Sequence, residues 1–295
     1  MRTPLSLFFT ATLIALLAGC RRPPSSSQVD AGSPSAAVKG PRGTVTVKGS
    51  DTMVLLGQRW AEQFMKTHPG AKIQVTGGGS GTGIAALING TTDIAMSSRP
   101  IKEAEKQQAR QRDPDGPVEV PVARDGITFY VHESNPVDVL TIAQLKDIYL
   151  ADVTRWKDLG GRDAPIVPYS RENSSGTYSF VKDEVLGGED FTPRALTLPG
   201  TAAVVHAVSL DRNGIGYGGS AYAKGVKEVK VKKDAHAEAI APTPENIRSG
   251  AYPLSRRLFF YLPREASGID RDFIDYALSP EGQKIVLEVG YFPEK

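Results

Sequence analysis

The chain has 295 residues, of which 40% are hydrophobic, and its formal net charge at pH 7 is +2. This length suffices for one large α/β domain or two lobes, and the small net charge argues against a nucleic acid or an acidic lipid surface as partner. The single cysteine, Cys20, excludes an internal disulfide.

The N-terminal segment is typical of an export signal. Arg2 precedes an apolar run over residues 5–18, which is too short to cross a bilayer as a mature helix. The sequence Leu17-Ala18-Gly19-Cys20 resembles the lipobox of bacterial lipoproteins, which implies a signal peptide over residues 1–19, cleavage before Cys20 and lipidation of Cys20. The alternative is an ordinary signal peptide with a chance cysteine. Arg21 follows in place of the Asp that signals retention at the inner membrane, so the choice of membrane stays open.

Residues 20–43 are expected to form the lipidated cysteine and a flexible tether. Pro, Ser, Ala and Gly dominate this segment and large apolar residues are few, so it cannot bury enough surface to order itself. The folded part is therefore expected to begin at about residue 44.

The first part of the folded chain alternates strands and helices. Residues 44–48 predict a strand that runs into Ser50-Asp51-Thr52-Met53 and an amphipathic helix. Residues 72–76 predict a second strand, followed by the Gly/Ser/Thr stretch of residues 77–83 and a short apolar helix face. Residues 93–96 predict a third strand, which ends in Ser97-Ser98-Arg99.

The second part repeats this pattern. Residues 118–131 hold two extended runs, which Arg124-Asp125-Gly126 separates. The apolar residues 166–168 predict a strand that leads through Arg171-Glu172-Asn173-Ser174-Ser175-Gly176-Thr177 into a helix over residues 178–186. Residues 258–262 are continuously apolar, as in a strand covered on both faces, and a helical C-terminal part follows.

Three turns between a strand and a helix are suited to binding an anion. Alternating strands and helices favour parallel sheets with right-handed crossovers, and ligands of such sheets bind at the carboxyl ends of the strands. The turns at residues 50–53, 77–83 and 171–177 offer hydroxyl groups, glycines and the free N–H groups of helix starts, and Arg171 adds a planar positive charge. They predict a site for a tetrahedral oxyanion. The alternative for the third turn is a helix N-cap with a surface arginine.

Other classes of site fit less well. The glycine-rich stretch fails the dinucleotide fingerprint, and Ile84 stands where a phosphate loop needs Lys. Ser80 and Ser175 could be nucleophiles, but all four histidines lie outside these motifs, so no base is placed beside them. Paired metal-ligand spacing is also absent from the sequence. We therefore expect no enzyme activity, no catalytic residue, no cofactor and no metal.

The motifs together resemble the PstS family, the phosphate-binding proteins of bacterial ABC phosphate importers. The resemblance covers nearly all of residues 44–295 and rests on the order and spacing of seven stretches: 49–53, 77–83, 93–99, 171–177, 214–217, 252–256 and 279–284. It implies a two-lobed α/β periplasmic-binding-protein fold of type II, with two crossover strands and the ligand in the cleft between the lobes. Residues 44–124 and 251–295 would form lobe I, and residues 125–250 lobe II.

The resemblance also implies a set of ligand-binding residues. By position these are Thr52, through its hydroxyl, and Met53, through its backbone N–H, together with Ser80, Ser98, Arg171, Ser175, Gly176 and Thr177. Well-known members carry an acceptor carboxylate in a Ser-Asp pair, for which this chain has Ser97-Ser98. A carboxylate can accept the proton of hydrogen phosphate, whereas sulfate has no proton to give. Asp125 is our hypothesis for the replacement, and its alternative is a residue of an Asp-Gly turn.

The expected function follows from the resemblance. The chain would be a monomeric lipoprotein, anchored to a bacterial membrane at the periplasm or cell surface, that captures inorganic phosphate and delivers it to ABC permease subunits. The alternative is a receptor for sulfate or another tetrahedral oxyanion that serves sensing or adhesion.

Overall fold

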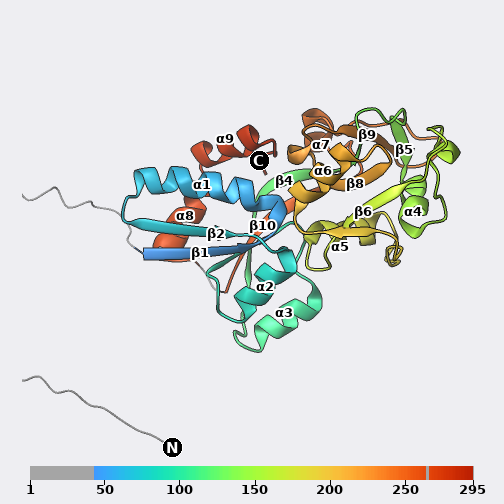
Figure 1. Cartoon of the computed structure of the whole chain (residues 1–295). Coiled ribbons are helices and arrows are strands. Elements are labelled where there is room, and N and C mark those ends of the chain that lie inside the picture. Colours follow the sequence, from blue (N-terminus) through green and yellow to red (C-terminus); the bar gives the residue numbers. More distant parts are fainter. Residues whose placement is uncertain (1–42, 264–265, 295) are drawn as a thin grey trace, which may run out of the picture. The chain divides into compact units, whose positions relative to one another are not determined.

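The computed structural model of the chain describes residues 43–263 and 266–294, which form a mixed α/β fold (Figure 1). The predicted signal peptide, Cys20 and the tether through residue 42 lie outside the described residues.

Hydrogen bonds connect the strands of the described residues in the order β2-β1-β3-β10-β4-β8-β6-β7, and β9 pairs with both β4 and β5. The strands are β1 (Gly43–Gly49), β2 (Ala71–Thr76), β3 (Ile94–Ser97), β4 (Val118–Val131), β5 (Val139–Thr141), β6 (Val167–Arg171), β7 (Leu196–Leu198), β8 (Gly214–Gly219), β9 (Lys227–Lys232) and β10 (Ser255–Leu262).

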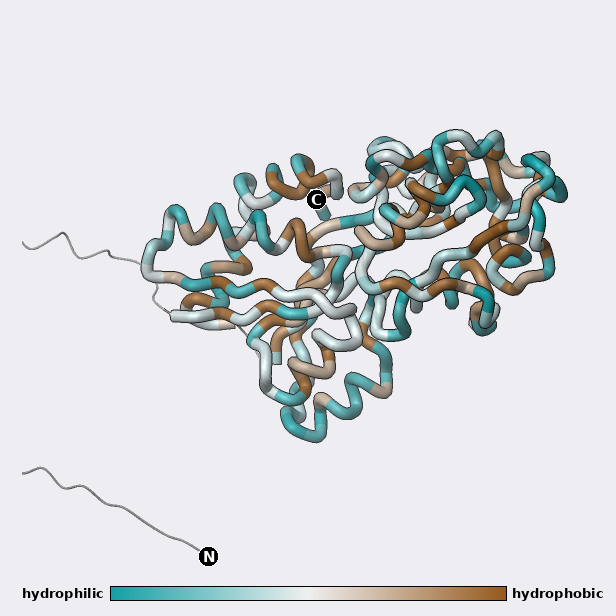
Figure 2. The backbone as a smooth tube through the Cα atoms, in the orientation of Figure 1, coloured by the Kyte–Doolittle hydropathy of each residue, from teal (hydrophilic) through white to brown (hydrophobic). Residues whose placement is uncertain are grey.

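Helices cover the strands (Figure 1). The α-helices are α1 (Val54–Thr67), α2 (Ser80–Ile88), α3 (Glu103–Arg110), α4 (Ile142–Leu150), α5 (Gly176–Glu184), α6 (Thr201–Leu210), α7 (Pro244–Ser249), α8 (Gly268–Leu278) and α9 (Pro280–Val289). Short 3-10 helices are η1 (Asp51–Met53), η2 (Trp156–Leu159) and η3 (Ser220–Tyr222). The α-helix α3 has no buried residue, and its tube is mostly hydrophilic in Figure 2.

The strands are only partly parallel, which corrects the expectation of parallel sheets. β1 runs parallel to β2 and β3, and β6 runs parallel to β7 and β8. β10, however, is antiparallel to both β3 and β4, and β4 is antiparallel to β8 and β9. The two parallel groups are thus joined through antiparallel strands, which strand-helix alternation along the chain does not reveal.

β4 connects the two groups of strands without a break. Residues 118–126 pair with β10, and residues 127–131 pair with β8. The predicted division at Arg124-Asp125-Gly126 is therefore wrong, and so is the alternative that Asp125 belongs to an Asp-Gly turn. Pairing with β10 keeps these residues extended, and its register places Asp125 opposite Arg256.

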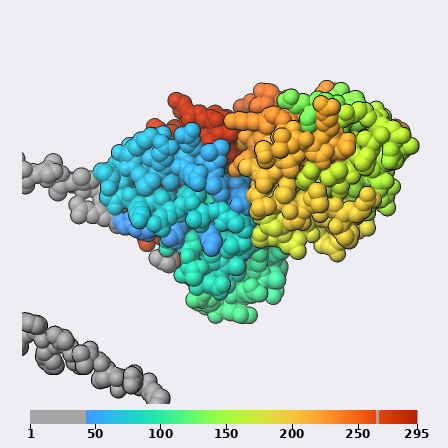
Figure 3. Space-filling view, in the orientation of Figure 1, coloured from blue at the N-terminus to red at the C-terminus, as the bar shows by residue number. Residues whose placement is uncertain are grey.

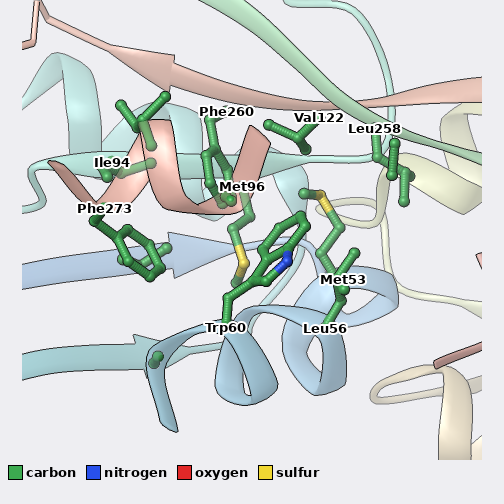
Figure 4. Close-up of a cluster of buried hydrophobic side chains, with 14 of the residues drawn as sticks. Met53, Leu56, Trp60, Ile94, Met96, Val122, Leu258, Phe260 and Phe273 are labelled. Atoms are coloured by element: carbon green, nitrogen blue, oxygen red, sulfur yellow. The ribbon is translucent and has the colours of Figure 1, made fainter. Parts of the chain in front are cut away.

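Two large hydrophobic cores lie on either side of this connection. One draws on residues between Val45 and Ala123 and between Leu258 and Tyr291, and Trp60 packs edge-on against Phe260 within it (Figure 4). The other draws on residues between Ile127 and Leu254, with Phe292 added. Each group of strands and helices therefore has its own apolar interior.

Candidate functional site

The three predicted turns come together in the structure. Their residues open η1, α2 and α5, which follow β1, β2 and β6. The Gly81 N–H donates to the Ser174 carbonyl over 2.8 Å, and the Gly79 N–H donates to the Gly49 carbonyl over 3.0 Å. In the space-filling view, the blue and teal atoms of the first part of the chain meet the yellow atoms of the second part along one boundary (Figure 3). Parallel pairing explains the first two turns, since carboxyl ends of neighbouring parallel strands share an edge.

Three buried serines form the first part of the cluster. The Ser50 Oγ donates to the Ser98 Oγ over 2.9 Å, and the Ser80 and Ser98 Oγ atoms lie 3.3 Å apart. The Ser98 N–H also donates to the Ser80 Oγ over 3.0 Å. Gly176 lies against them, because a Cβ at this position would come within 2.4 Å of the Ser80 Oγ and 2.6 Å of the Ser98 Oγ. The start of α5 therefore approaches these hydroxyls as closely as only a glycine permits.

Two buried threonines form the second part. The Oγ1 atoms of Thr52 and Thr177 lie 3.1 Å apart, although the two residues are 125 positions apart in the chain. The Ser175 Oγ accepts hydrogen bonds of 3.2 Å from the N–H groups of Thr177 and Tyr178. Ser175 is therefore the side-chain N-cap of α5, as the alternative interpretation of this turn proposed.

Met53 is also buried beside this cluster, but its N–H already has an acceptor. It donates to the Ser50 carbonyl over 2.9 Å, which is the hydrogen bond of a tight turn. A ligand would have to share this donor.

Arg171 is buried, which corrects the alternative of a surface arginine. Only 1% of the residue is exposed. Its Nη1 donates to the Thr201 Oγ1 over 3.0 Å, its Nη2 to the Asp51 Oδ2 over 2.9 Å, and its Nε to the Glu172 Oε2 over 3.0 Å. Burial acts to raise the pKa of the Glu172 carboxyl, but hydrogen bonds and the positive charge of Arg171 outweigh it, so the pKa is lowered. The guanidinium is thus held on all three nitrogens between two carboxylates and a hydroxyl.

Asp125 forms a second buried ion pair, with Arg256. The Nε and Nη2 of Arg256 donate to the Asp125 Oδ2 over 3.1 and 2.9 Å. The same Nη2 reaches the Oγ1 of Thr177 at 3.0 Å and that of Thr52 at 3.3 Å. Burial raises the pKa of the Asp125 carboxyl, against the opposing charge and hydrogen bonds of Arg256. Asp125 is therefore linked to the threonine pair through a guanidinium.

Sequence reasoning missed the residues that support the cluster. Asp51 and Glu172 stand inside the quoted motifs, directly beside Thr52 and Arg171. This position is a signal that could have identified them as hydrogen-bond partners of the Arg171 guanidinium. Arg256 ends the stretch 252–256 of the family resemblance, but it lies 204 positions from Thr52, and nothing in that stretch marks the two residues as neighbours.

The described parts of the chain lack two other features. Among residues 43–263 and 266–294, no group of three or more His, Cys, Asp or Glu side chains is placed to hold a metal ion. Within the same residues, no helix combines the length and the apolar character needed to cross a membrane.

Comparisons with known proteins agree on one family. The PBP superfamily domain matches residues 34–281. The phosphate-binding protein PstS of Pseudomonas aeruginosa is 35% identical in an alignment 271 residues long that covers 86% of this chain and 84% of that protein. PstS of Staphylococcus haemolyticus is 35% identical in an alignment 266 residues long that covers 86% of this chain and 83% of that one.

Solved structures give the same result. A putative phosphate ABC transporter substrate-binding protein from Clostridium perfringens, with bound phosphate, is 34% identical and superposes with a TM-score of 0.78 over 86% of this chain and all of that one. An ABC-type phosphate transport receptor from Vibrio cholerae is 30% identical, with a TM-score of 0.68 over 84% of this chain and 99% of that one. The predicted two-lobed α/β fold is therefore confirmed, and the chain belongs to the PstS family of phosphate-binding proteins within the PBP superfamily.

Proposed function

We propose that this protein captures inorganic phosphate outside the cytoplasm and delivers it to the permease subunits of an ABC transporter. The observation that carries the proposal is the buried cluster of hydroxyl groups from three distant turns. The hydroxyls of Thr52 and Thr177 meet the guanidinium of Arg256, and the helix start at Gly176 packs against those of Ser80 and Ser98. Hydroxyl donors, a helix N-terminus and guanidinium groups are what a tetrahedral oxyanion needs. The names of the relatives support phosphate as that oxyanion.

The proposed ligand-binding residues are those expected from the sequence: Thr52, Met53, Ser80, Ser98, Asp125, Arg171, Ser175, Gly176 and Thr177. Their mutual contacts support the set, since Ser80 and Ser98 lie against Gly176 and Thr52 lies against Thr177. Asp125 is proposed as the carboxylate that accepts the phosphate proton. Its Oδ1 is buried and has no hydrogen-bond partner among the described residues, which supports this role.

Binding is proposed to close two lobes around the anion. The expected lobes are residues 44–124 with 251–295, and residues 125–250. The first hydrophobic core supports the boundary near residue 124, whereas Tyr252, Leu254 and Phe292 pack in the second core and extend the second lobe beyond residue 250. Closure excludes water and thereby strengthens each charged hydrogen bond to the ligand. The closed form would be the state that the permease recognises.

The protein is proposed to act without covalent chemistry, as a monomer anchored through a lipidated Cys20. The hydrogen bonds of Ser80 and Ser175 support the first point, because Ser80 contacts Ser98 and Ser175 caps α5, so neither hydroxyl is arranged beside an imidazole base. The lipobox resemblance supports the anchor.

The proposal is tested by what copurifies with the protein. Protein produced without its first 43 residues is purified in phosphate-free buffer and denatured in acid, and the phosphate released is measured against protein concentration. We expect a molar ratio approaching one, because a buried site releases its ligand slowly. Protein that carries no phosphate, and takes up none after dialysis against a phosphate buffer, would refute the function.

A further inference from the structure

Arg256 occupies an unusual place for a charged side chain. It lies in the middle of the sheet, on β10, directly opposite Asp125 of β4. Only 8% of Arg256 and 0% of Asp125 is exposed. The Phe180 ring of α5 faces its guanidinium, with the ring centre 5.6 Å from Cζ. The guanidinium is therefore fixed by a carboxylate on one side and an aromatic ring on another.

The shape of the guanidinium determines which edge faces the cluster. It is a planar fork, and Nε and Nη2 form one edge, which is turned to the Asp125 Oδ2. Nη2 also contacts the Oγ1 atoms of Thr52 and Thr177. The remaining edge, formed by Nη2 and Nη1, is therefore the one beside the two threonine hydroxyls.

Nη1 is a buried donor that has no hydrogen-bond partner among the described residues. Arg171 differs in this respect, because all three of its nitrogens have protein acceptors. A buried donor without an acceptor destabilises the protein, and more so when it carries charge. Burial also lowers the pKa of Arg256, with Asp125 opposing the effect. An anionic acceptor at Nη1 would offset both penalties.

We propose that Arg256 is a second cationic ligand of the anion, donating from Nη1 to an oxygen of the bound phosphate. Asp125 acts as its positioning residue through Oδ2. The inference rests on the proposed function, and it adds a ligand that is not in the set expected from the sequence. Because Asp51, Glu172 and Thr201 accept hydrogen bonds from all three nitrogens of Arg171, this residue contributes mainly a fixed positive charge to the site.

The test is a calorimetric titration of refolded, phosphate-free protein with inorganic phosphate at neutral pH. Arg256→Met keeps the length of the side chain and removes its donors, and we expect phosphate binding to weaken about 10- to 100-fold, as for a lost charged hydrogen bond. Arg256→Lys keeps a charge without the fork, and an intermediate loss is expected. The matched control is Arg257→Met, whose side chain is 52% exposed and pairs with Glu294. It should bind within about twofold of the unchanged protein.

The outcomes separate the inference from the function on which it rests. Unchanged protein that binds no phosphate overturns the proposed function, and the inference with it. Normal binding by unchanged protein together with binding within threefold by Arg256→Met overturns the inference alone.

A second variant and a second measurement guard against a folding defect. Where Arg256→Met leaves Asp125 unpaired and does not fold, Arg256→Met combined with Asp125→Asn removes both charges. Because Asp125 is itself a proposed ligand, the double variant is compared with Asp125→Asn alone and should bind phosphate at least about tenfold more weakly than that variant. In NMR spectra, the Nη signals missing from Arg256→Lys identify Arg256, and they should shift and exchange more slowly when phosphate is added. Equal affinity of the double variant and Asp125→Asn, or Nη signals that do not respond to phosphate, would overturn the inference.

Discussion

The Arg171 guanidinium donates to the Asp51 carboxylate over 2.9 Å and thereby connects the end of β6 to η1, the 3-10 helix after β1. The same carboxylate accepts the Gly78 N–H over 2.9 Å, so Asp51 joins all three turns of the cluster. Only 1% of the Arg171 side chain and 18% of the Asp51 side chain is exposed.

The first prediction concerns this ion pair. Asp51→Ala leaves a buried guanidinium with one acceptor fewer, and the free energy of unfolding should fall by about 2–4 kcal/mol, measured by urea denaturation. The matched control is Asp163→Ala, which removes an exposed pair with Arg155 and should cost less than about 1 kcal/mol. Equal effects of the two substitutions would contradict a structural role for Asp51.

A second prediction concerns the threonine pair. Thr177→Val keeps the volume of the side chain and removes the hydroxyl that contacts Thr52 and Arg256. Phosphate affinity should fall about 10- to 100-fold, as expected for one lost hydrogen bond at a charged ligand. Thr44→Val on the exposed start of β1 is the control and should leave affinity unchanged. Full affinity in Thr177→Val would remove this hydroxyl from the site.

A third prediction uses the close approach of α5. Gly176→Ala places a Cβ within 2.4 Å of the Ser80 Oγ, so the helix start has to move away, and phosphate affinity should fall by at least about tenfold. Gly81→Ala is the graded comparison, because its nearest new contact is the Ser174 carbonyl at 3.3 Å. Its effect on affinity should be clearly smaller. The reverse order would show that the packing around Gly176 does not control the site.

A fourth prediction concerns pH. Burial raises the pKa of the Glu228 carboxyl from 4.5 to about 7. The folded protein then binds a proton that the unfolded chain has lost, so the free energy of unfolding should decrease as the pH rises from about 4.5 to about 7. Thermal unfolding across this range should show the decrease, and Glu228→Gln should weaken it. If the free energy of unfolding of Glu228→Gln decreased by the same amount over this pH range, the pH dependence would have to come from another group.

The sequence predicted the cluster better than it predicted its supports. Strand-turn-helix patterns located Thr52, Ser80 and Gly176 because each follows a strand by one turn, and parallel strands bring such turns to one edge. Ser98, at the end of β3, came only from the resemblance to the PstS family.

Arg256 shows what sequence patterns could not predict. Its contact with Asp125 depends on the antiparallel register of β4 and β10, which pairs residues 131 positions apart. The same pairing explains the wrong division of residues 118–131. Asp and Gly favour a turn locally, but tertiary pairing with β10 holds them in one strand.

The central claim is that the site binds phosphate, and calorimetric titration of refolded, phosphate-free protein tests it most directly. Phosphate and then sulfate are titrated separately at neutral pH. We expect saturable binding of one phosphate per chain and no response to sulfate, because a buried carboxylate accepts the proton of hydrogen phosphate and repels an anion without one. Binding of sulfate as tight as that of phosphate would contradict a role for Asp125 as acceptor, and absence of binding to either anion would contradict the account as a whole.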